Sequence, residues 1–145
     1  MPIRFESLRE SDLPVEFGRY TLTALLGSGG MGKVFRAQMR GPEGFRKDVA
    51  IKVIGRQSSE AERAHQEFVR EARFSGLLKH PNVVDIYDFG VEDGHPWLAM
   101  EIVEGGTLQT LLSEGPLPPT AALDLGIQVC DALSHAHGLD RKSVV

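Results

Sequence analysis

The segment from Leu26 to Val34 combines residue types that can hold a phosphate group. It reads Leu-Gly-Ser-Gly-Gly-Met-Gly-Lys-Val, so four of its nine residues are glycines. Glycine lets the backbone come close to a phosphate and turn its N–H groups toward it. The composition of this segment is compatible with phosphate binding, and the spacing of its glycines and the residues around them must decide which kind of site, if any, it forms.

Three phosphate-binding patterns overlap in this segment, and two of them fit poorly. The Walker A pattern, G-x-x-x-x-G-K-[ST], is met by Gly27, Gly32 and Lys33, but Val34 stands where a hydroxyl should bind Mg²⁺. The dinucleotide pattern, G-x-G-x-x-G, is met by Gly27, Gly29 and Gly32. Both patterns need a helix directly after the loop, because the helix N-terminus holds the phosphate. The residues after the loop instead alternate like a strand.

The third pattern, G-x-G-x-x-G-x-V, belongs to a loop between two antiparallel strands, and it is met in full. Gly27, Gly29, Gly32 and Val34 occupy its defined positions. Strand-forming residues lie on both sides of the loop. The alternative is a glycine-rich hairpin that binds no ligand, and residues further along the chain must decide between the two.

The rest of the chain predicts the elements that position this loop. One helix is expected to open at Ser59 with a capping box and to end before Pro81. A short helix at 107–112 and a longer one from Pro118 to about His137 are expected near the C-terminus. The order predicts an α+β fold whose composition changes near residue 105, as in two lobes joined by a hinge. The five predicted strands are 20–26, 33–40, 49–54, 83–89 and 97–103.

Composition bounds the class of protein. With 145 residues, 41% of them hydrophobic and 25% charged, the chain has the make-up of one globular domain. A net charge of -4 argues against nucleic-acid binding, which needs a basic surface. No apolar run reaches the roughly 18–20 residues of a membrane span, and the N-terminus lacks the apolar core of a signal peptide. Since Cys130 is the single cysteine, the chain is expected in the reducing cytoplasm.

Ordered motifs beyond the loop resemble those of protein kinases. The sequence Val-Ala-Ile-Lys at 49–52 matches the V-A-I-K strand of that family. Glu71 lies nineteen residues after Lys52 and nine before His80, which is the family's spacing between its lysine, its helix glutamate and its His-Pro motif. Residues 97–108 are similar to the fifth strand and hinge of kinases. The chain therefore resembles the N-terminal lobe of the eukaryotic-type serine/threonine protein kinases found in bacteria.

The resemblance implies two catalytic residues. Lys52 would hold the α- and β-phosphates of ATP, and Glu71 would pair with Lys52 and fix its direction. A strand lysine without such partners more often extends its charge into water. Glu67, one helical turn before Glu71, is expected to be a solvated helix residue. No residue of this chain is implied as a metal ligand.

The resemblance also implies the residues that bind ATP. The adenine would lie beneath an apolar roof, in front of a gatekeeper side chain and against the backbone of the hinge, with the ribose near a threonine. The roof residues are Leu26, Val34 and Ala50, the gatekeeper is Met100, the hinge residues are Glu101 and Val103, and the threonine is Thr107. The loop residues implied to bind the phosphates are Gly27, Ser28, Gly29, Gly30, Met31 and Gly32, together with Lys52.

The resemblance extends over residues 17–139 and implies the domain boundaries. Residues 1–16 are expected to be an N-terminal arm, 17–104 the ATP-binding lobe, and 105–139 the hinge exit with the first helices of an incomplete C-terminal lobe. Residues 140–145, Asp-Arg-Lys-Ser-Val-Val, can be written in codons that resemble a sequencing adapter, so they are expected to be a non-native tail. Re-amplification of the gene across the Leu139 codon tests this expectation.

The His-Arg-Asp and Asp-Phe-Gly motifs, which give kinases their catalytic aspartate and Mg²⁺ ligands, do not occur in these 145 residues. The parent enzyme is expected to use ATP and Mg²⁺ to transfer the γ-phosphoryl group to serine or threonine of a protein substrate. The fragment alone is expected to be inactive. The alternative is a non-catalytic, pseudokinase-like module that binds ATP or a partner. The parent could carry a membrane anchor further downstream.

Overall fold

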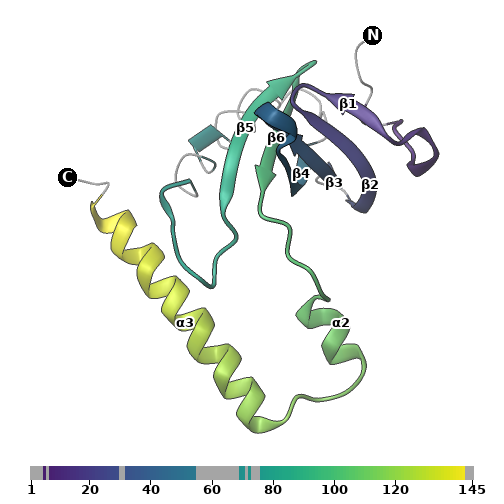
Figure 1. Ribbon diagram of the computed structural model, residues 1–145. Helices are drawn as coiled ribbons and strands as arrows, with labels where there is room; N and C mark the ends of the chain where they lie inside the picture. The colour runs from purple at the N-terminus through teal and green to yellow at the C-terminus, as the bar shows by residue number, and fades with distance from the viewer. Residues whose placement is uncertain are drawn as a thin grey trace. The chain divides into compact units, whose positions relative to one another are not determined.

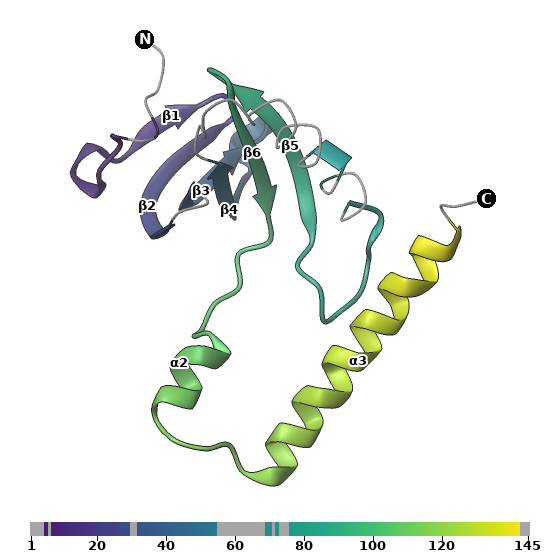
Figure 2. The ribbon, with the colours of Figure 1, turned by 180° about the vertical axis from the view of Figure 1, so that it is seen from behind.

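The computed structural model describes most of the chain, whose backbone folds into two compact units. The first unit comprises residues 1–77 and 85–102, and the second comprises residues 78–84 and 103–145. Figure 1 and Figure 2 show their elements from opposite sides. The residues described are 5, 7–29, 32–54, 69, 70, 72 and 76–142. Residues 140–142 are described by their backbone alone.

A six-stranded sheet forms most of the first unit. Its strands follow the order β1-β2-β3-β4-β6-β5, so β1 lies at one edge and β5 at the other (Figure 1). Every neighbouring pair is antiparallel. The strands are β1 Val15–Phe17, β2 Tyr20–Gly29, β3 Gly32–Arg40, β4 Arg46–Ile54, β5 Ile86–Glu92 and β6 His95–Met100. Two short 3₁₀ helices, Glu10–Asp12 and Pro42–Gly44, precede β1 and β4.

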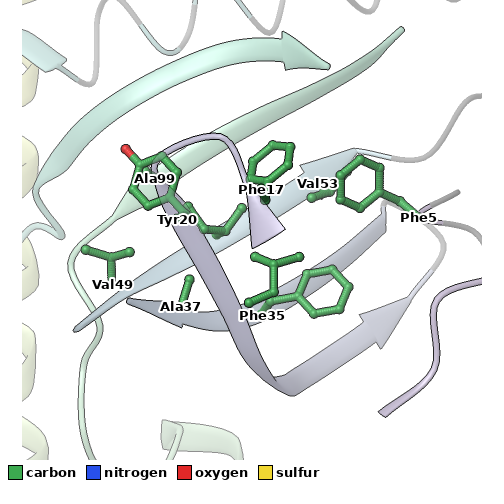
Figure 3. Close-up of a cluster of buried hydrophobic side chains, with 10 residues drawn as sticks. Phe5, Phe17, Tyr20, Phe35, Ala37, Val49, Val53 and Ala99 are labelled. Carbon is green, nitrogen blue, oxygen red and sulfur yellow. The ribbon is translucent and has the colours of Figure 1, made fainter. Parts of the chain in front are cut away.

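One face of the sheet carries the hydrophobic core. Successive side chains of a strand point to opposite faces, and Val49, Ile51 and Val53 of β4 are buried on the core face. Phe35 of β3 and Ala99 of β6 lie directly opposite Ile51 and are fully buried. Aromatic rings complete the cluster, as Figure 3 shows. The buried members are Phe5, Phe17, Tyr20, Leu22, Phe35, Ala37, Val49, Ile51, Val53 and Ala99.

The N-terminal residues contribute a sixth strand, where five strands were expected. β1 pairs with β2, with Val15 opposite Leu22. The rings of Phe5 and Phe17 meet edge to face, with their centroids 5.4 Å apart. Phe17 also meets the ring of Trp97 at 5.3 Å. The α+β class and the antiparallel sheet are confirmed, and the sheet is one strand wider than the alternating pattern predicted.

Two further differences concern residues between β4 and β5. β5 begins at Ile86 rather than at residue 83, because a turn occupies the preceding residues and the N–H of Val83 donates to the carbonyl oxygen of His80 at 3.0 Å. Most of the helix expected from Ser59 to residue 80 lies outside the described residues. Residues 69, 70, 72, 76 and 77, which are described, are helical.

The second unit contains helices α2 (Leu108–Ser113) and α3 (Pro119–Lys142). Both were expected, although α3 continues past His137. Residues 78–84 run alongside α3 in both views (Figures 1 and 2), with His80 Nε2 3.1 Å from the Asp131 carboxylate. Within the described ranges, no helix is both long and apolar enough to cross a membrane. Large apolar side chains exposed on α3 are Leu123, Ile127, Val129 and Leu133.

Candidate nucleotide-binding site

The face of the sheet opposite the core carries a row of four residues across its middle strands. Directly opposed residues of neighbouring strands share a face, with Cβ atoms roughly 4.5–5.5 Å apart. Ala50 of β4 lies opposite Met100 of β6 on one side and Arg36 of β3 on the other. Arg36 in turn lies opposite Ala24 of β2. The predicted roof residue Ala50 and gatekeeper Met100 are therefore neighbours on one face.

Lys52 lies in a second row on the same face. It is opposite Val34 of β3 and Leu98 of β6, and Val34 is opposite Gly27 of β2. Because Lys52 is two positions from Ala50 on β4, the two side chains point to the same face. The second row thus brings together a loop glycine, a predicted roof valine and the predicted phosphate-binding lysine.

The residues from 26 to 34, here called the glycine-rich hairpin, contain two kinds of glycine. A Cβ on Gly32 would lie 2.0 Å from the carbonyl oxygen of Val53, and Gly32 has a φ of 131°. Close pairing of β3 with β4 therefore requires glycine at this position. Among the described residues, a Cβ on Gly27 or Gly29 would meet no atom within 4 Å. This part of the chain gives no steric reason for glycine at 27 and 29, whereas a phosphate close to the backbone would give one.

A β-bulge marks the start of the glycine-rich hairpin. The register passes from Leu25 opposite Phe35 to Gly27 opposite Val34, so Leu26 is an extra residue in β2. A bulge bends its strand and increases the local twist. The Leu26 side chain is 51% exposed, which leaves an apolar surface beside the loop. Such a surface suits a flat ligand ring, and the place of Leu26 in the roof stays a prediction.

Reciprocal hydrogen bonds hold the residue after β6. The N–H of Glu101 donates to the carbonyl oxygen of Asp85 at 2.8 Å, and the N–H of Asp85 donates to the Glu101 carboxylate at 3.2 Å. This pair connects the end of β6 to the residue before β5. It fixes the backbone of Glu101, the first predicted hinge residue, directly beside Met100.

Two other predicted nucleotide residues, Val103 and Thr107, belong to the second unit. Val103 is 66% exposed. Thr107 is the N-cap of α2, and its hydroxyl accepts a hydrogen bond from the N–H of Thr110 at 3.1 Å. A threonine directly before a helix is a known capping signal, so this structural role of Thr107 could have been predicted from sequence and was missed.

The remaining predicted residues are only partly described. Gly30, Met31 and Glu71 lie outside the described residues, so the pairing of Lys52 with Glu71 stays a prediction. Ser28 is exposed at the end of β2, opposite Lys33 of β3.

A polar cluster that the sequence analysis missed joins β2 to β5 across the core. The Tyr20 hydroxyl donates to the Asp88 carboxylate at 3.0 Å, and the Arg19 guanidinium pairs with the same oxygen at 2.7 Å. Burial raises the pKa of Tyr20, and the hydrogen bond to Asp88 adds to the rise. The phenol therefore stays protonated and acts as a donor. The cluster is hidden in the sequence because 68 positions separate Tyr20 from Asp88.

Known proteins that are similar to this chain are protein kinases. A family model described as "Protein tyrosine and serine/threonine kinase" matches residues 20–145. The serine/threonine-protein kinase pkn3 of Myxococcus xanthus is 43% identical over 122 residues, which cover 83% of this chain and 22% of that relative. The serine/threonine-protein kinase PrkC of Bacillus subtilis is 38% identical over 121 residues, which cover 83% of this chain and 18% of that relative. The chain thus spans about a fifth of the length of these curated relatives.

The fold is also similar to that of solved kinase structures. The crystal structure of the PknI kinase domain of Mycobacterium tuberculosis matches with a TM-score of 0.76 and 29% sequence identity. That match covers 91% of this chain and 51% of the PknI chain. The sheet that carries the candidate site therefore has a counterpart in a kinase domain.

Proposed function

Since the chain belongs to the protein tyrosine and serine/threonine kinase family, we propose that it is the ATP-binding portion of a serine/threonine protein kinase. The observation that carries the proposal is the row of Gly27, Val34 and Lys52, which lies next to the Ala50–Met100 pair on one face of the sheet. That face offers apolar surface for a base and, beside it, a positive charge for phosphates.

The adenine ring is assigned to the Ala50–Met100 end of this face. Ala50 is a small apolar residue on this face, and Val34 of β3 and Leu26 of β2 add apolar side chains. Adenine also needs hydrogen bonds at its edge, and exposed backbone after β6 can supply them. The backbone groups assigned to this role are the carbonyl of Glu101 and the N–H of Val103, with Thr107 assigned to the ribose.

The phosphates are assigned to the loop glycines and to Lys52. No atom of the described residues lies where a Cβ of Gly27 or Gly29 would be, so a phosphate can come close to the backbone there. Lys52 adds a charge-assisted hydrogen bond, and Glu71 is assigned as the carboxylate that directs it. The other loop residues assigned to the phosphates are Ser28, Gly30, Met31 and Gly32.

The proposed reaction of the whole protein is phosphoryl transfer. A serine or threonine hydroxyl oxygen of a protein substrate attacks the γ-phosphorus of ATP, the bond to the β–γ bridging oxygen breaks, and ADP leaves. The hydroxyl proton passes to a base. Bound Mg²⁺ would neutralise phosphate charge, but no group of His, Cys, Asp or Glu side chains in the described part of the chain forms a metal site, so no ligand is assigned to it here. We place this portion in the cytoplasm, where ATP is available.

Two lysine variants test the assignment in the full-length protein that carries this chain. Lys52→Met should lower the rate of phosphoryl transfer by roughly 10²–10³-fold, the usual effect of losing one donor to a transition-state charge. Lys47→Met is the matched control. Lys47 lies on the same strand, but its Nζ is 3.7 Å from the centre of the Tyr87 ring, on the core side of the sheet. Transfer should be unchanged in that control.

The measurement is transfer of labelled phosphate from ATP to a general protein substrate, followed by identification of the labelled amino acid. Label on serine or threonine, lost in Lys52→Met and retained in Lys47→Met, would support the proposal. Unchanged transfer in Lys52→Met would refute the role of Lys52. Binding of ATP without any transfer would favour a non-catalytic, pseudokinase-like module.

A further inference from the structure

The N-terminal segment, defined as Phe5 together with residues 7–17, packs on the core face of the sheet. Phe5 and Phe17 are each 3% exposed. The ring of Phe5 meets the ring of His95 at 5.4 Å, and the ring of Phe17 meets that of Trp97 at 5.3 Å. Both ring contacts are with β6, while β1 pairs with β2. The segment is therefore anchored to two separate strands of the sheet.

Lys33 connects this segment to the glycine-rich hairpin. It directly follows Gly32 and lies opposite Val53, which places its side chain on the core face. Its Nζ donates a hydrogen bond to the carbonyl oxygen of Leu8 at 2.7 Å. The bond is partly buried, so salt screens it less than it screens a surface pair. Bonds with one charged member are also about twice as strong as neutral ones.

Because successive side chains of β3 point to opposite faces of the sheet, Lys33 on the core face has neighbours in β3 on the other face. Val34, the next residue, points to the face that holds Gly27 and Lys52. Gly32, the residue before, fits its backbone closely against Val53. A shift of Lys33 must therefore move the loop glycine on one side of it and the proposed roof residue on the other.

We propose that Lys33 is a positioning residue, which holds the glycine-rich hairpin through the Leu8 carbonyl and so fixes its place over the phosphates of ATP. This inference rests on the proposed function. A loop with four glycines has many accessible conformations, and ordering it when a ligand binds opposes binding. The hydrogen bond from Lys33 to Leu8 orders the base of the loop before ATP binds, and so reduces the entropy that is lost on binding.

The test is calorimetric titration of ATP into the full-length protein, at a temperature where circular dichroism reports a folded protein. Lys33→Met removes the donor and keeps the aliphatic chain, so we expect the Kd for ATP to rise about fivefold, which is about 1 kcal/mol at 1.4 kcal/mol per tenfold change. Lys33→Arg keeps a charged donor and should retain most of the affinity. Lys47→Met, the matched control, should leave the Kd unchanged.

A second variant, Phe5→Ala, measures whether Lys33 acts through the N-terminal segment. It loosens the segment without changing any residue of the glycine-rich hairpin, so it should raise the Kd for ATP by itself. Added to Lys33→Met, it should raise the Kd little further, because both changes remove the same restraint. This non-additivity is not expected if Lys33 merely stabilises the fold.

Several outcomes would overturn the inference. An unchanged Kd in Lys33→Met, or fully additive effects in the double variant, would do so. If Lys33→Met does not fold, the Kd of Phe5→Ala for ATP decides the question alone. An unchanged Kd in Phe5→Ala then refutes the inference that the N-terminal segment holds the glycine-rich hairpin. A wild-type protein that binds no ATP would overturn the proposed function itself, and this inference with it.

Discussion

Gly32→Ala is expected to destabilise the fold, whereas Gly29→Ala, three residues earlier, is expected to leave it intact. The new Cβ at position 32 would lie 2.0 Å from the carbonyl oxygen of Val53 and 3.0 Å from the Cα of Ile54. Both are backbone atoms of β4 and cannot rotate away as a side chain can. One strand must therefore move, and the φ of 131° adds strain for any residue with a Cβ.

The magnitude follows from these two effects. Holding a residue in a sparsely populated backbone region costs about 1–3 kcal/mol. Forcing an extra methyl group against packed atoms costs about 1–3 kcal/mol more. We therefore expect Gly32→Ala to lower the free energy of unfolding by about 3 kcal/mol and the Tm by about 10 °C. A Cβ at Gly29 meets nothing within 4 Å, so Gly29→Ala should change stability by less than about 0.5 kcal/mol.

The two variants are compared by thermal unfolding and by ATP titration. Trp97 is the single tryptophan of the 145 residues and packs against Phe17, so in a protein made of these residues its fluorescence follows unfolding of the sheet. Gly29→Ala should weaken ATP binding without lowering the Tm, because its methyl group occupies the approach to the backbone. A Gly32→Ala protein as stable as the wild type would refute the steric reasoning. An equal loss of Tm in Gly29→Ala would refute the distinction between the two glycines.

Three further predictions concern stability. Burial and the hydrogen bond to Asp88 raise the pKa of Tyr20 above its ordinary 10.0. The contribution of Tyr20 to the free energy of unfolding is therefore complete below pH 10 and is lost as the pH rises above 10. Urea titrations should find this alkaline loss in the wild type and not in Tyr20→Phe. Gly90→Ala would put a Cβ 2.7 Å from the Trp97 ring; it should cost about 1–3 kcal/mol and shift the tryptophan emission spectrum, and an unshifted spectrum would contradict the packing. Thr107→Ala should lower stability by about 1 kcal/mol through loss of the α2 cap, whereas Thr107→Ser should keep it; both are measured by chemical denaturation.

The strands of the glycine-rich hairpin could be predicted because their signals are local. Alternating side chains placed a strand at 33–40, and β3 spans Gly32–Arg40. The pairing of Ala50 with Met100 could not be derived in this way, because it depends on β4 lying beside β6 rather than beside β5. Strand order is a property of the whole sheet, and only the resemblance to kinases supplied it.

Two features of the site had no local signal. The bulge at Leu26 adds one residue to β2 and so decides which loop residue lies opposite Val34, yet no residue type marks it. The anchors of the N-terminal segment, Phe5 and Phe17, follow no helical or strand period. Their partners His95 and Trp97 lie far along the chain. Contacts of that kind emerge only when the chain has folded.

The N-terminal segment extends the core of the sheet beyond the residues that the family model matches. The family match begins at residue 20, but the core of the same sheet includes Phe5 and Phe17. A chimaera spliced at residue 20 would therefore remove the Phe17 ring from Trp97 and keep only the Tyr20 ring beside it. A splice before Phe5 would carry the matching rings along. In this protein, the part that has to be exchanged in one piece therefore begins before Phe5, whereas the family match begins at residue 20.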